Sequence, residues 1–239
     1  MDPRPLISYF AGMQSNCFRI SRMRSFVARS LGDVLDAFSS NEPVPGGGSA
    51  AALAGALGVS VLLMTAGLPK TRTGSAQERR DLDEAAERLL PVRVTLAALV
   101  DRDSDAYRIV VNAIRLPKDS PDEKAVRRRA IAQAMRAATE TPLQTMRACQ
   151  LALAETPAVA ESCLKGAASD VGVAIELLRA ALRGAAMNVD ANLKDLSDRE
   201  FAESVRAERH TLETRSAADA DRALRLLDGA LVRSTELAS

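Results

Sequence analysis

The stretch that most constrains this chain is Pro43-Val44-Pro45-Gly46-Gly47-Gly48-Ser49 and the run of small and apolar residues behind it, Ala50 to Leu68. From Pro43 to Leu68 there is no charged residue. The two prolines stiffen the approach, and the three glycines allow backbone angles that other residues adopt only at a cost. Ser49 is predicted to cap the helix that follows. The sequence therefore predicts a loop of bare backbone at a helix N-terminus, where free N–H groups suit an anion or a carbonyl oxygen.

Other interpretations of this stretch stay open. One is a plain helix cap with a flexible lead-in. A nucleotide phosphate loop is disfavoured because no Gly-Lys-Ser/Thr follows the glycines. A membrane span would fit the length of the run, but the run is rich in Ala and Gly, lacks a flanking Trp or Tyr belt and stands alone in a charged chain. The composition favours a tightly packed internal helix without a membrane, in which small residues let neighbours approach closely: Ala54, Gly55, Gly58 and Ser60.

Composition narrows the class of protein. The chain has 239 residues, 47% of them apolar, which is enough for one large core or two small ones. A net charge of +1 and the scarcity of aromatic residues disfavour a nucleic-acid partner. Ala, Leu and Arg dominate and β-branched runs are few, which predicts an all-α chain.

Cysteine and histidine usage limits the chemistry. Cys17, Cys149 and Cys163 are odd in number and scattered, which fits neither a disulfide framework nor a zinc site. The sole histidine, His210, lies in a charged segment. A histidine-based triad and a His/Cys metal cluster are therefore excluded. We expect no metal, although a site built from carboxylates alone stays open.

The chain is expected to form one domain. Residues 1–23 look unlike the rest and are predicted to be a dispensable leader; Leu6 to Phe10 is too short for a signal-peptide core. The helical domain is predicted to span residues 24–239. Because no export signal can be recognised, we expect the protein to be in the cytoplasm.

Hydrophobic periodicity predicts a single-domain bundle of long antiparallel helices. We expect breaks or kinks at the internal prolines, at Pro91, near Thr141-Pro142 and at Thr156-Pro157. A basic loop, Pro69 to Ser75, separates the small-residue helix from the next one. The predicted helices cover 25–39, the run from Ala50, 77–115, 122–155, 170–188 after a Ser169 cap, and two further helices from Asp198 onward.

One acidic residue stands out in this pattern. Asp103 falls on the apolar stripe of the helix 77–115, between Leu99 and Ala106, whereas Asp101 and Asp105 lie off it. The spacing therefore predicts that Asp103 faces the interior. A buried carboxylate is costly unless it is paired or used.

Several stretches together resemble the formiminotransferase-cyclodeaminase C-terminal domain, a family shared with the methenyltetrahydrofolate cyclohydrolases. Each motif is weak alone, but their order and spacing fit over roughly residues 25–235. The matching stretches are Pro43 to Ser49 with Ala50 to Gly58, Asp103-Ser104-Asp105-Ala106-Tyr107, Arg115-Leu116-Pro117-Lys118, Ser169 to Ala174, and Gly184 to Leu193.

The resemblance implies an all-α fold, a homodimer and a folate site near the Pro-Gly loop. It implies hydrolysis of 5,10-methenyltetrahydrofolate to 10-formyltetrahydrofolate, or closure of formimino-tetrahydrofolate to the methenyl form with release of ammonia. Both reactions act on one carbon between two nitrogens and need proton transfer, not a bound metal or redox cofactor; the tetrahydrofolate derivative is the substrate. We expect the cyclohydrolase first, because no formiminotransferase domain is fused to the sequence.

Candidate roles follow from the matching residues. Asp103 and Asp170 are candidates for proton transfer, since burial raises a carboxyl pKa toward the working range. Asp170 could instead simply stabilise its helix terminus, and Asp103 could form a buried ion pair. Asn188 and Asn192 are expected to orient the pterin amide or a water, or else to cap a helix end. The other predicted substrate-binding residues are Pro45, Gly46, Gly47, Gly48, Ser49 and Ser169, with Lys70 and Arg72 for the glutamate tail.

The chain departs from the family pattern at one place. Before Ser-Asp the family commonly has Gly-Asn-x-Asn-Ala, and this chain has Cys163-Leu164-Lys165-Gly166-Ala167. Both asparagines are missing. A further alternative is therefore a non-catalytic helical dimer that has kept the fold.

Overall fold

The computed structural model describes residues 25–236, with side chains to residue 228, so the predicted leader lies outside the described residues. Within this range the chain is helical and has no strand; its one extended pairing is an isolated bridge between Thr71 and Cys163. The all-α prediction is confirmed. The elements are η1 (Phe26–Ala28), α2 (Leu31–Ser39), α3 (Gly47–Ala66), α4 (Ala76–Ile114), α5 (Pro121–Ser162), η2 (Lys165–Ala167), α6 (Ala168–Lys194) and α7 (Arg199–Glu236).

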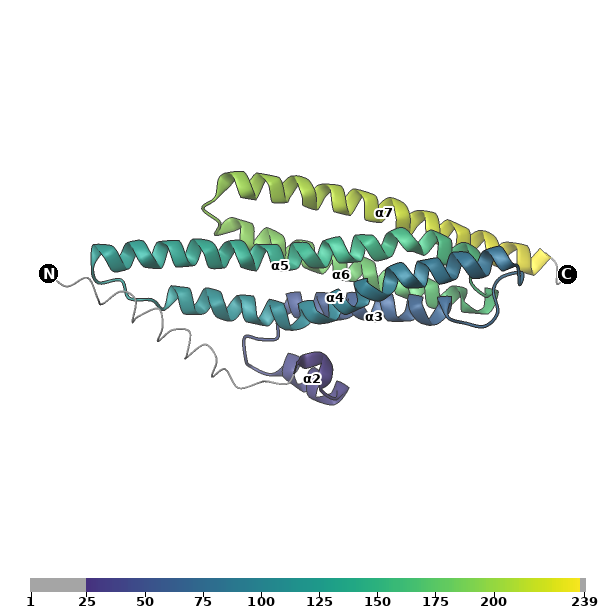
Figure 1. Ribbon diagram of the computed structural model, residues 1–239, viewed down its shortest axis with the longest axis horizontal. Coiled ribbons are helices and arrows are strands. Elements are labelled where there is room, and N and C mark those ends of the chain that lie inside the picture. The colour runs from purple at the N-terminus through teal and green to yellow at the C-terminus, as the bar shows by residue number, and fades with distance from the viewer. Residues whose placement is uncertain (1–24, 237–239) are drawn as a thin grey trace.

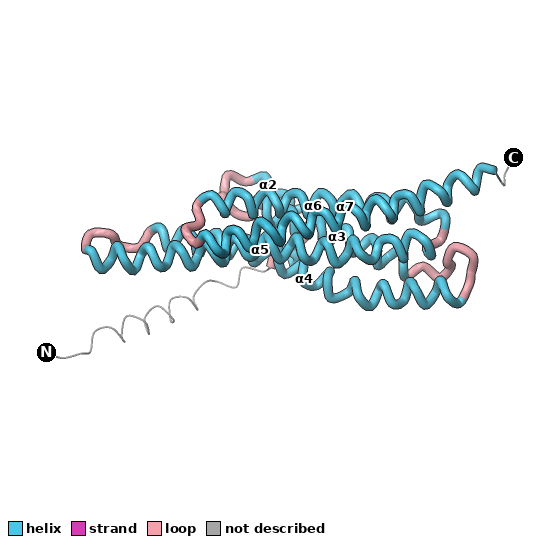
Figure 2. The backbone as a smooth tube through the Cα atoms, turned by 90° about the horizontal axis from the view of Figure 1, so that it is seen from above, coloured by secondary structure: helices cyan, strands magenta, loops and turns pink. Residues whose placement is uncertain are grey.

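The long helices run side by side along one axis (Figure 1). Helix α5 is central and packs against α4, α6 and α7, and α3 lies between α4 and α6 (Figure 2). Short helix α2 stands apart, on the side of the bundle away from α5 and α7 (Figure 1). The N-terminal part is anchored to α4, because the Phe26 N–H donates to Asp101 Oδ1 at 2.9 Å and the Ser25 hydroxyl donates to Asp101 Oδ2.

Helix α3 is apolar because it is close-packed. A Cβ added at Gly58 would lie 3.0 Å from the Ala174 carbonyl oxygen, and one at Gly55 would lie 3.2 Å from Cys149 Sγ. The small residues thus permit the close approach that the sequence predicts. Helix α3 is also long and apolar enough for a membrane span, at a mean hydropathy of 1.8, but 56% of that window is buried among the neighbouring helices.

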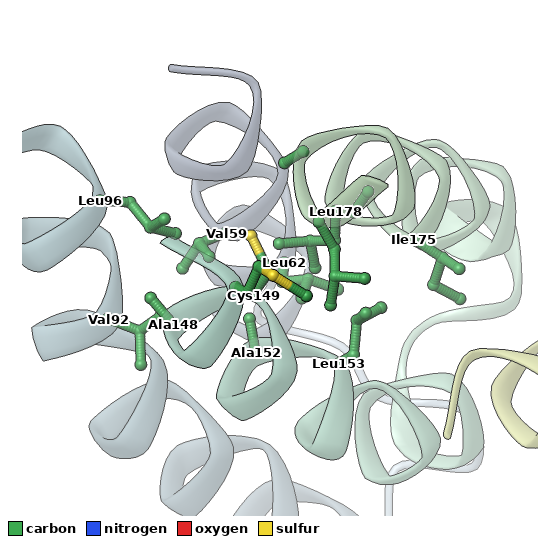
Figure 3. Close-up of a cluster of buried hydrophobic side chains, with 14 of the residues drawn as sticks. Val59, Leu62, Val92, Leu96, Ala148, Cys149, Ala152, Leu153, Ile175 and Leu178 are labelled. Carbon is green, nitrogen blue, oxygen red and sulfur yellow. The ribbon is translucent and has the colours of Figure 1, made fainter. Parts of the chain in front are cut away.

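The core lies where α3, α4, α5 and α6 meet. Figure 3 shows Val59 and Leu62 of α3 facing side chains from the other three helices, Leu96, Cys149 and Leu178 among them. Cys149 is completely buried, which raises the pKa of its thiol to about 12. Cys149 and Cys163 are both free thiols, as the sequence predicts.

The chain does not break at its internal prolines, so the predicted interruptions near Pro142 and Pro157 are wrong. Helix α4 is continuous through Pro91, and α5 is continuous through Pro142 and Pro157. A proline inside a helix removes one backbone hydrogen bond, but α4 packs against α3 and α5, and α5 also packs against α6 and α7, which supports each as one helix. The segment after Asp198 is one helix, α7, and not two as expected; it packs against α5 and α6.

Two predicted caps are also wrong. Helix α3 begins at Gly47 with Gly46 at the cap position, so Ser49 lies in the first turn. Helix α6 begins at Ala168 with Ala167 at the cap position, so Ser169 lies inside it. The predicted first helix is divided into η1 and α2, with Ser30 accepting a hydrogen bond from the Asp33 N–H as the cap of α2.

The basic loop between α3 and α4 is fixed by one carboxylate. Glu78 accepts hydrogen bonds from the Thr71 hydroxyl at 2.6 Å, from the Thr73 N–H at 2.9 Å and from the Thr73 hydroxyl at 2.9 Å. It also completes a capping box with Ser75. These donors, the Thr71 hydroxyl first, lower the pKa of Glu78 to about 2.

We expect Glu78→Gln to free this loop and to change the acid stability of the protein. A carboxyl whose folded pKa is depressed stabilises the fold above its ordinary value of 4.5, and this contribution is lost as the pH falls toward 2. Thermal unfolding at a series of pH values should show a smaller drop between pH 4.5 and 2 for Glu78→Gln than for wild type. The control is Glu203→Gln, an exposed glutamate of α7, which should follow wild type.

Candidate functional site

Asp103 connects α4 to the N-terminus of α3. Its Oδ2 accepts a hydrogen bond from the Ser49 N–H at 2.8 Å and lies 3.0 Å from Ser49 Oγ. The cap position, Gly46, has no side chain to satisfy the free N–H groups of α3. A carboxylate from α4 therefore takes the place of the missing cap, where the helix dipole favours negative charge.

The other carboxylate oxygen of Asp103 lies against bare backbone. A Cβ added at Gly48 would lie 2.1 Å from Asp103 Oδ1, so only glycine fits at this position. Among residues 25–236, no donor forms a hydrogen bond with Oδ1. The interior position that the hydrophobic spacing predicts for Asp103 is confirmed, and it brings one carboxylate oxygen to the Pro-Gly loop without a protein partner.

Burial raises the pKa of the Asp103 carboxyl, and the two hydrogen bonds from Ser49 oppose this rise only in part. The local hydrogen bonding is consistent with a raised value. Ser49 Oγ lies 2.8 Å from the Val100 carbonyl oxygen as well as 3.0 Å from Asp103 Oδ2, and one hydroxyl proton cannot be donated to both. A protonated Asp103 can donate to Ser49 Oγ, which then donates to Val100. The site thus holds the Asp103 carboxyl against Ser49 at the N-terminus of α3.

A cavity of about 410 Å³ opens one helical turn beyond Asp103, which does not itself line it. Pro43 and Val44 of the Pro-Gly loop line one part of it. Tyr107 and Asn112 of α4 line another, together with Arg115, the residue after α4. Its volume lies within the range of about 300–1,000 Å³ that small-molecule sites usually have. Tyr107 is one helical turn beyond Asp103 on the same face of α4, and its ring is 44% exposed. We did not predict roles for Tyr107, Asn112 or Arg115, although the spacing of four residues from Asp103 to Tyr107 carries that signal.

The two candidate asparagines of α6 do different things. Asn188 lies at the loop: a Cβ added at Gly47 would be 3.8 Å from its Nδ2, which donates to the Gly184 carbonyl at 2.9 Å. Asn192 Nδ2 donates instead to the Ala138 carbonyl of α5 at 2.9 Å. The structure therefore brings Asn188 to the Pro-Gly loop and uses the amide of Asn192 to join α6 to α5.

The remaining candidates lie at the other end of α3. Lys70 and Arg72 follow the C-terminus of α3, about 30 Å from Gly47 along a helix of this length. Arg72 is already engaged, because its guanidinium donates to the Ala160 carbonyl and its N–H donates to the Ser162 carbonyl at 3.0 Å. Helices α3 and α6 are antiparallel, so Ser169 and Asp170 at the start of α6 also lie at this end.

Asp103 and Asp170 therefore do not meet within one chain. Gly58 of α3 contacts Ala174 and Leu178 of α6, and Gly47 lies near Asn188. This register puts Asp170 roughly 25 Å from Asp103 along the bundle, at a rise of about 1.5 Å per residue. Of the predicted site residues, one chain brings together Asp103, the Pro-Gly loop and Asn188, and it places the others elsewhere.

Similarity to known proteins now adds to this geometry. The sequence profile described as formiminotransferase-cyclodeaminase matches residues 30–211. A methenyltetrahydrofolate cyclohydrolase of Methylorubrum extorquens is 38% identical over 169 residues, which cover 71% of this chain and 81% of that enzyme.

The chain belongs to the formiminotransferase-cyclodeaminase family.

Other relatives in this family extend the comparison. The formimidoyltransferase-cyclodeaminase of Sus scrofa is 34% identical over 195 residues, covering 77% of this chain and 34% of that protein, so the chain spans about a third of its length. The crystal structure of formiminotetrahydrofolate cyclodeaminase from Thermotoga maritima superimposes with a TM-score of 0.76 at 25% identity. The superposition covers 86% of this chain and 99% of that one, so the family fold is present in full.

Among residues 25–228, the Pro-Gly loop of this family member has no metal cluster, and a larger cavity lies elsewhere. Within residues 25–236, no three His, Cys, Asp or Glu side chains are close enough to hold a metal ion. A larger cavity, about 670 Å³, lies between α4 and α5 around Pro91 and Leu151. We place the candidate site at the Pro-Gly end of α3 because Asp103 lies there. Among residues 25–228, Asp103 is the only carboxyl whose pKa burial clearly raises, and it is one helical turn from Tyr107 of the smaller cavity.

Proposed function

We propose that this protein hydrolyses 5,10-methenyltetrahydrofolate to 10-formyltetrahydrofolate and that it acts as a homodimer. The observation that carries the proposal is the position of Asp103, a mostly buried carboxyl with one oxygen held by Ser49 and the other against the bare backbone of Gly48. The adjoining cavity provides room for a pterin ring. The similarity to a methenyltetrahydrofolate cyclohydrolase over most of both chains favours this reaction over its relatives.

The proposed reaction needs one water and one proton acceptor. The reacting carbon of the substrate carries positive charge shared between its two nitrogens. Asp103 takes a proton from the attacking water as the new C–O bond forms, which gives a neutral tetrahedral adduct. Asp103 then returns this proton to the pterin nitrogen as its C–N bond breaks, and the hydroxyl proton is released as the formyl C=O forms.

The loop and Asn188 orient the substrate in this scheme. The pterin carries amide N–H and C=O groups, which require fixed donors and acceptors. The side-chain amide of Asn188, at Gly47, provides an acceptor oxygen, and the exposed first turn of α3 provides backbone N–H groups. Before it takes the proton, Asp103 is a negatively charged carboxylate. This charge also stabilises the cationic substrate electrostatically.

A second candidate is the cyclodeaminase reaction, which closes formimino-tetrahydrofolate and releases ammonia. It is supported by the structural similarity to formiminotetrahydrofolate cyclodeaminase, which matches that chain over 99% of its length. Both reactions pass through a tetrahedral carbon between two nitrogens and require a group that accepts and returns a proton. The same Asp103 would serve either one.

The test is the decay of 5,10-methenyltetrahydrofolate absorbance with purified protein, measured against a buffer blank because the bridge opens slowly by itself. We expect decay well above the blank for wild type and decay close to the blank for Asp103→Asn. Formation of the methenyl absorbance from formimino-tetrahydrofolate would establish the second candidate instead. Inactivity with both substrates would contradict the proposal and leave a non-catalytic dimer.

Tyr107 is expected to bind the pterin by stacking. Its ring is exposed, lines the cavity and lies one turn from Asp103. Removing an aromatic contact of about 1–3 kcal/mol should raise KM roughly 10-fold in Tyr107→Ala with a smaller change in kcat. Steady-state kinetics decide this, with Tyr107→Phe as the control that keeps the ring; an unchanged KM in Tyr107→Ala would place the pterin elsewhere.

A further inference from the structure

A small cavity of about 240 Å³ lies between α6 and α7, and neither α4 nor the Pro-Gly loop contributes to its wall. Residues three and four apart share one face of a helix, so each wall of the cavity is a single helix face. The lining residues are Arg179, Leu182 and Arg183 of α6 and Glu213, Ser216 and Ala217 of α7, together with Leu153 of α5. Polar groups from two helices therefore converge on one space outside the site at Asp103.

The hydroxyl of Ser216 has no partner in this cavity. Ser216 is 3% exposed, and its Oγ is the one hydroxyl oxygen of residues 25–228 that is buried without a hydrogen bond. A hydroxyl inside a helix commonly donates to a carbonyl one turn back. The other described hydroxyls of α7 do so at 2.8 to 3.0 Å, those of Ser204, Thr211 and Thr214. A buried hydroxyl without a partner is costly, and Ser216 lines the cavity, so its hydroxyl is available to a ligand there.

Two arginines of α6, four residues apart, line the wall opposite Ser216. Arg183 forms no hydrogen bond or ion pair with any residue between 25 and 228, and it is exposed, so the cavity opens to solvent there. Arg179 is held only loosely, with its Nη1 3.5 Å from Glu176 and 3.7 Å from Asp221. Like charges at this helical spacing repel each other. An anion between the two guanidinium groups would remove this repulsion.

The carboxylate in the cavity wall does not neutralise these arginines. Glu213 Oε2 accepts a hydrogen bond from Arg209 Nη1 at 3.1 Å, so its charge is directed to another residue of α7. Two arginines and one glutamate give the lining residues a net charge of +1. The cavity therefore favours an anion over a cation.

The volume of the cavity limits the size of the ligand. Small-molecule sites usually measure about 300–1,000 Å³, which is more than this cavity provides. A single phosphate group fits, whereas a whole nucleotide or folate does not. Guanidinium groups bind phosphate oxygens through paired N–H donors, and a hydroxyl can donate to a further oxygen. Donors on two opposite walls suit a tetrahedral anion better than a planar carboxylate, whose oxygens lie on one side.

We propose that this cavity binds a phosphate group, either as inorganic phosphate or as the end of a phosphate monoester. Arg179 and Arg183 donate to the phosphate oxygens from α6, and the Ser216 hydroxyl donates from α7. The bound anion thus bridges α6 and α7 beside the long ion pair between Arg179 and Asp221. The site is independent of the proposed folate chemistry, because Asp103 does not line it.

Binding is tested by calorimetry on wild-type protein purified without phosphate, with chloride added to keep the ionic strength constant. Inorganic phosphate and glycerol 3-phosphate are titrated separately. We expect saturable binding of at least one of them with a Kd of about 1 mM or lower, and the one that binds identifies the source of the phosphate group. If neither binds saturably up to about 10 mM, water alone fills the cavity and the proposal is overturned.

Two variants place the anion in this cavity. Arg183→Gln removes the unpaired guanidinium and Ser216→Ala removes the buried hydroxyl, and each should raise the Kd about 10-fold or more. The matched controls are Arg206→Gln and Ser204→Ala, exposed residues of α7 that do not line the cavity, and both should bind like wild type. Wild-type affinity in Arg183→Gln or in Ser216→Ala would mean that the anion binds elsewhere.

Thermal unfolding distinguishes ligand binding from a structural role of Ser216. Without phosphate, Ser216→Ala should be at least as stable as wild type, because it removes a buried hydroxyl that has no partner. With increasing phosphate, the Tm of wild type should rise more than that of Ser216→Ala, since a ligand stabilises the fold that binds it. Phosphate also stabilises proteins by exclusion from their surface. Equal rises in the two proteins would reflect exclusion alone and would contradict the site.

Discussion

Asp103→Asn is expected to lower kcat/KM by roughly 10²- to 10⁴-fold, the usual loss when a general acid or base is removed. Asparagine keeps the size of the side chain and can still accept from the Ser49 N–H, so the helices should stay folded. The amide cannot take a proton from water. Steady-state kinetics and circular dichroism, measured together, distinguish loss of chemistry from loss of fold.

The pH dependence gives a second signature of Asp103. As a base, it must be ionised, so wild-type kcat/KM should fall as the pH decreases through its raised pKa, above the ordinary value of 3.8. Because the folded pKa is raised, the protonated carboxyl stabilises the fold below the ordinary value, and this contribution is lost as the pH rises through the folded pKa. Asp103→Asn should therefore be at least as stable as wild type at pH 7.

An exposed aspartate provides the control for this variant. Asp83 also lies on α4, is 64% exposed and forms only a surface ion pair with Arg79. Asp83→Asn should keep wild-type kinetics, since an exposed pair is worth about 0–1 kcal/mol. If Asp103→Asn were as active as Asp83→Asn, the role of Asp103 in proton transfer would be ruled out.

Gly48→Ala is expected to reduce kcat/KM by at least about 100-fold through Asp103, because the new atom takes the space of its carboxylate. A Cβ 2.1 Å from Asp103 Oδ1 cannot be accommodated, so the carboxylate must turn away from the Ser49 N–H and hydroxyl. Overpacking of this kind also costs about 1–3 kcal/mol of stability. Kinetics and denaturant unfolding measure the two effects.

A double-mutant cycle shows whether Gly48 acts through Asp103. If it does, the double variant Gly48→Ala/Asp103→Asn should be hardly less active than Asp103→Asn alone, since the group displaced is already inactive. Gly172→Ala is the matched control, because a Cβ at Gly172 of α6 meets no atom within 4 Å. If the loss of kcat/KM in the double variant equals the product of the two single losses, Gly48 does not act through Asp103.

Spacing and composition predict the parts of this fold that depend on periodicity. The stripe from Leu99 to Ala106 places Asp103 inside because α4 is regular there, and the small residues of α3 predict close packing because Gly55 and Gly58 allow it. Rules based on neighbouring residues in the sequence fail where contacts between distant residues determine the structure. Pro142 lies in the middle of α5, held by helices on several sides, and the cap of α3 comes from Asp103, 54 positions from Ser49.

The candidate site, too, is predicted from the sequence only in part. The Pro-Gly loop and Asp103 can be recognised in the sequence, but their distance from Asp170 depends on the antiparallel register of α3 and α6, which no local pattern encodes. Tyr107 and Arg115 belong to stretches that resemble the family, but the sequence alone predicts no role for either of them. The sequence does not predict which side chain packs against each glycine. That Gly48 makes room for Asp103 is seen only in the structure.

The position of α3 in the chain affects how the protein emerges from the ribosome. Helix α3 ends at Ala66, whereas α6, which packs along it, begins at Ala168. At the usual rate of about 5–20 residues per second, the intervening stretch of about 100 residues takes roughly 5–20 s to synthesise. During that interval an uncharged segment as long as a membrane span lacks one of its two lateral neighbours. Apolar surface of α3 therefore stays uncovered during synthesis, and the late arrival of α6 sets the length of that interval.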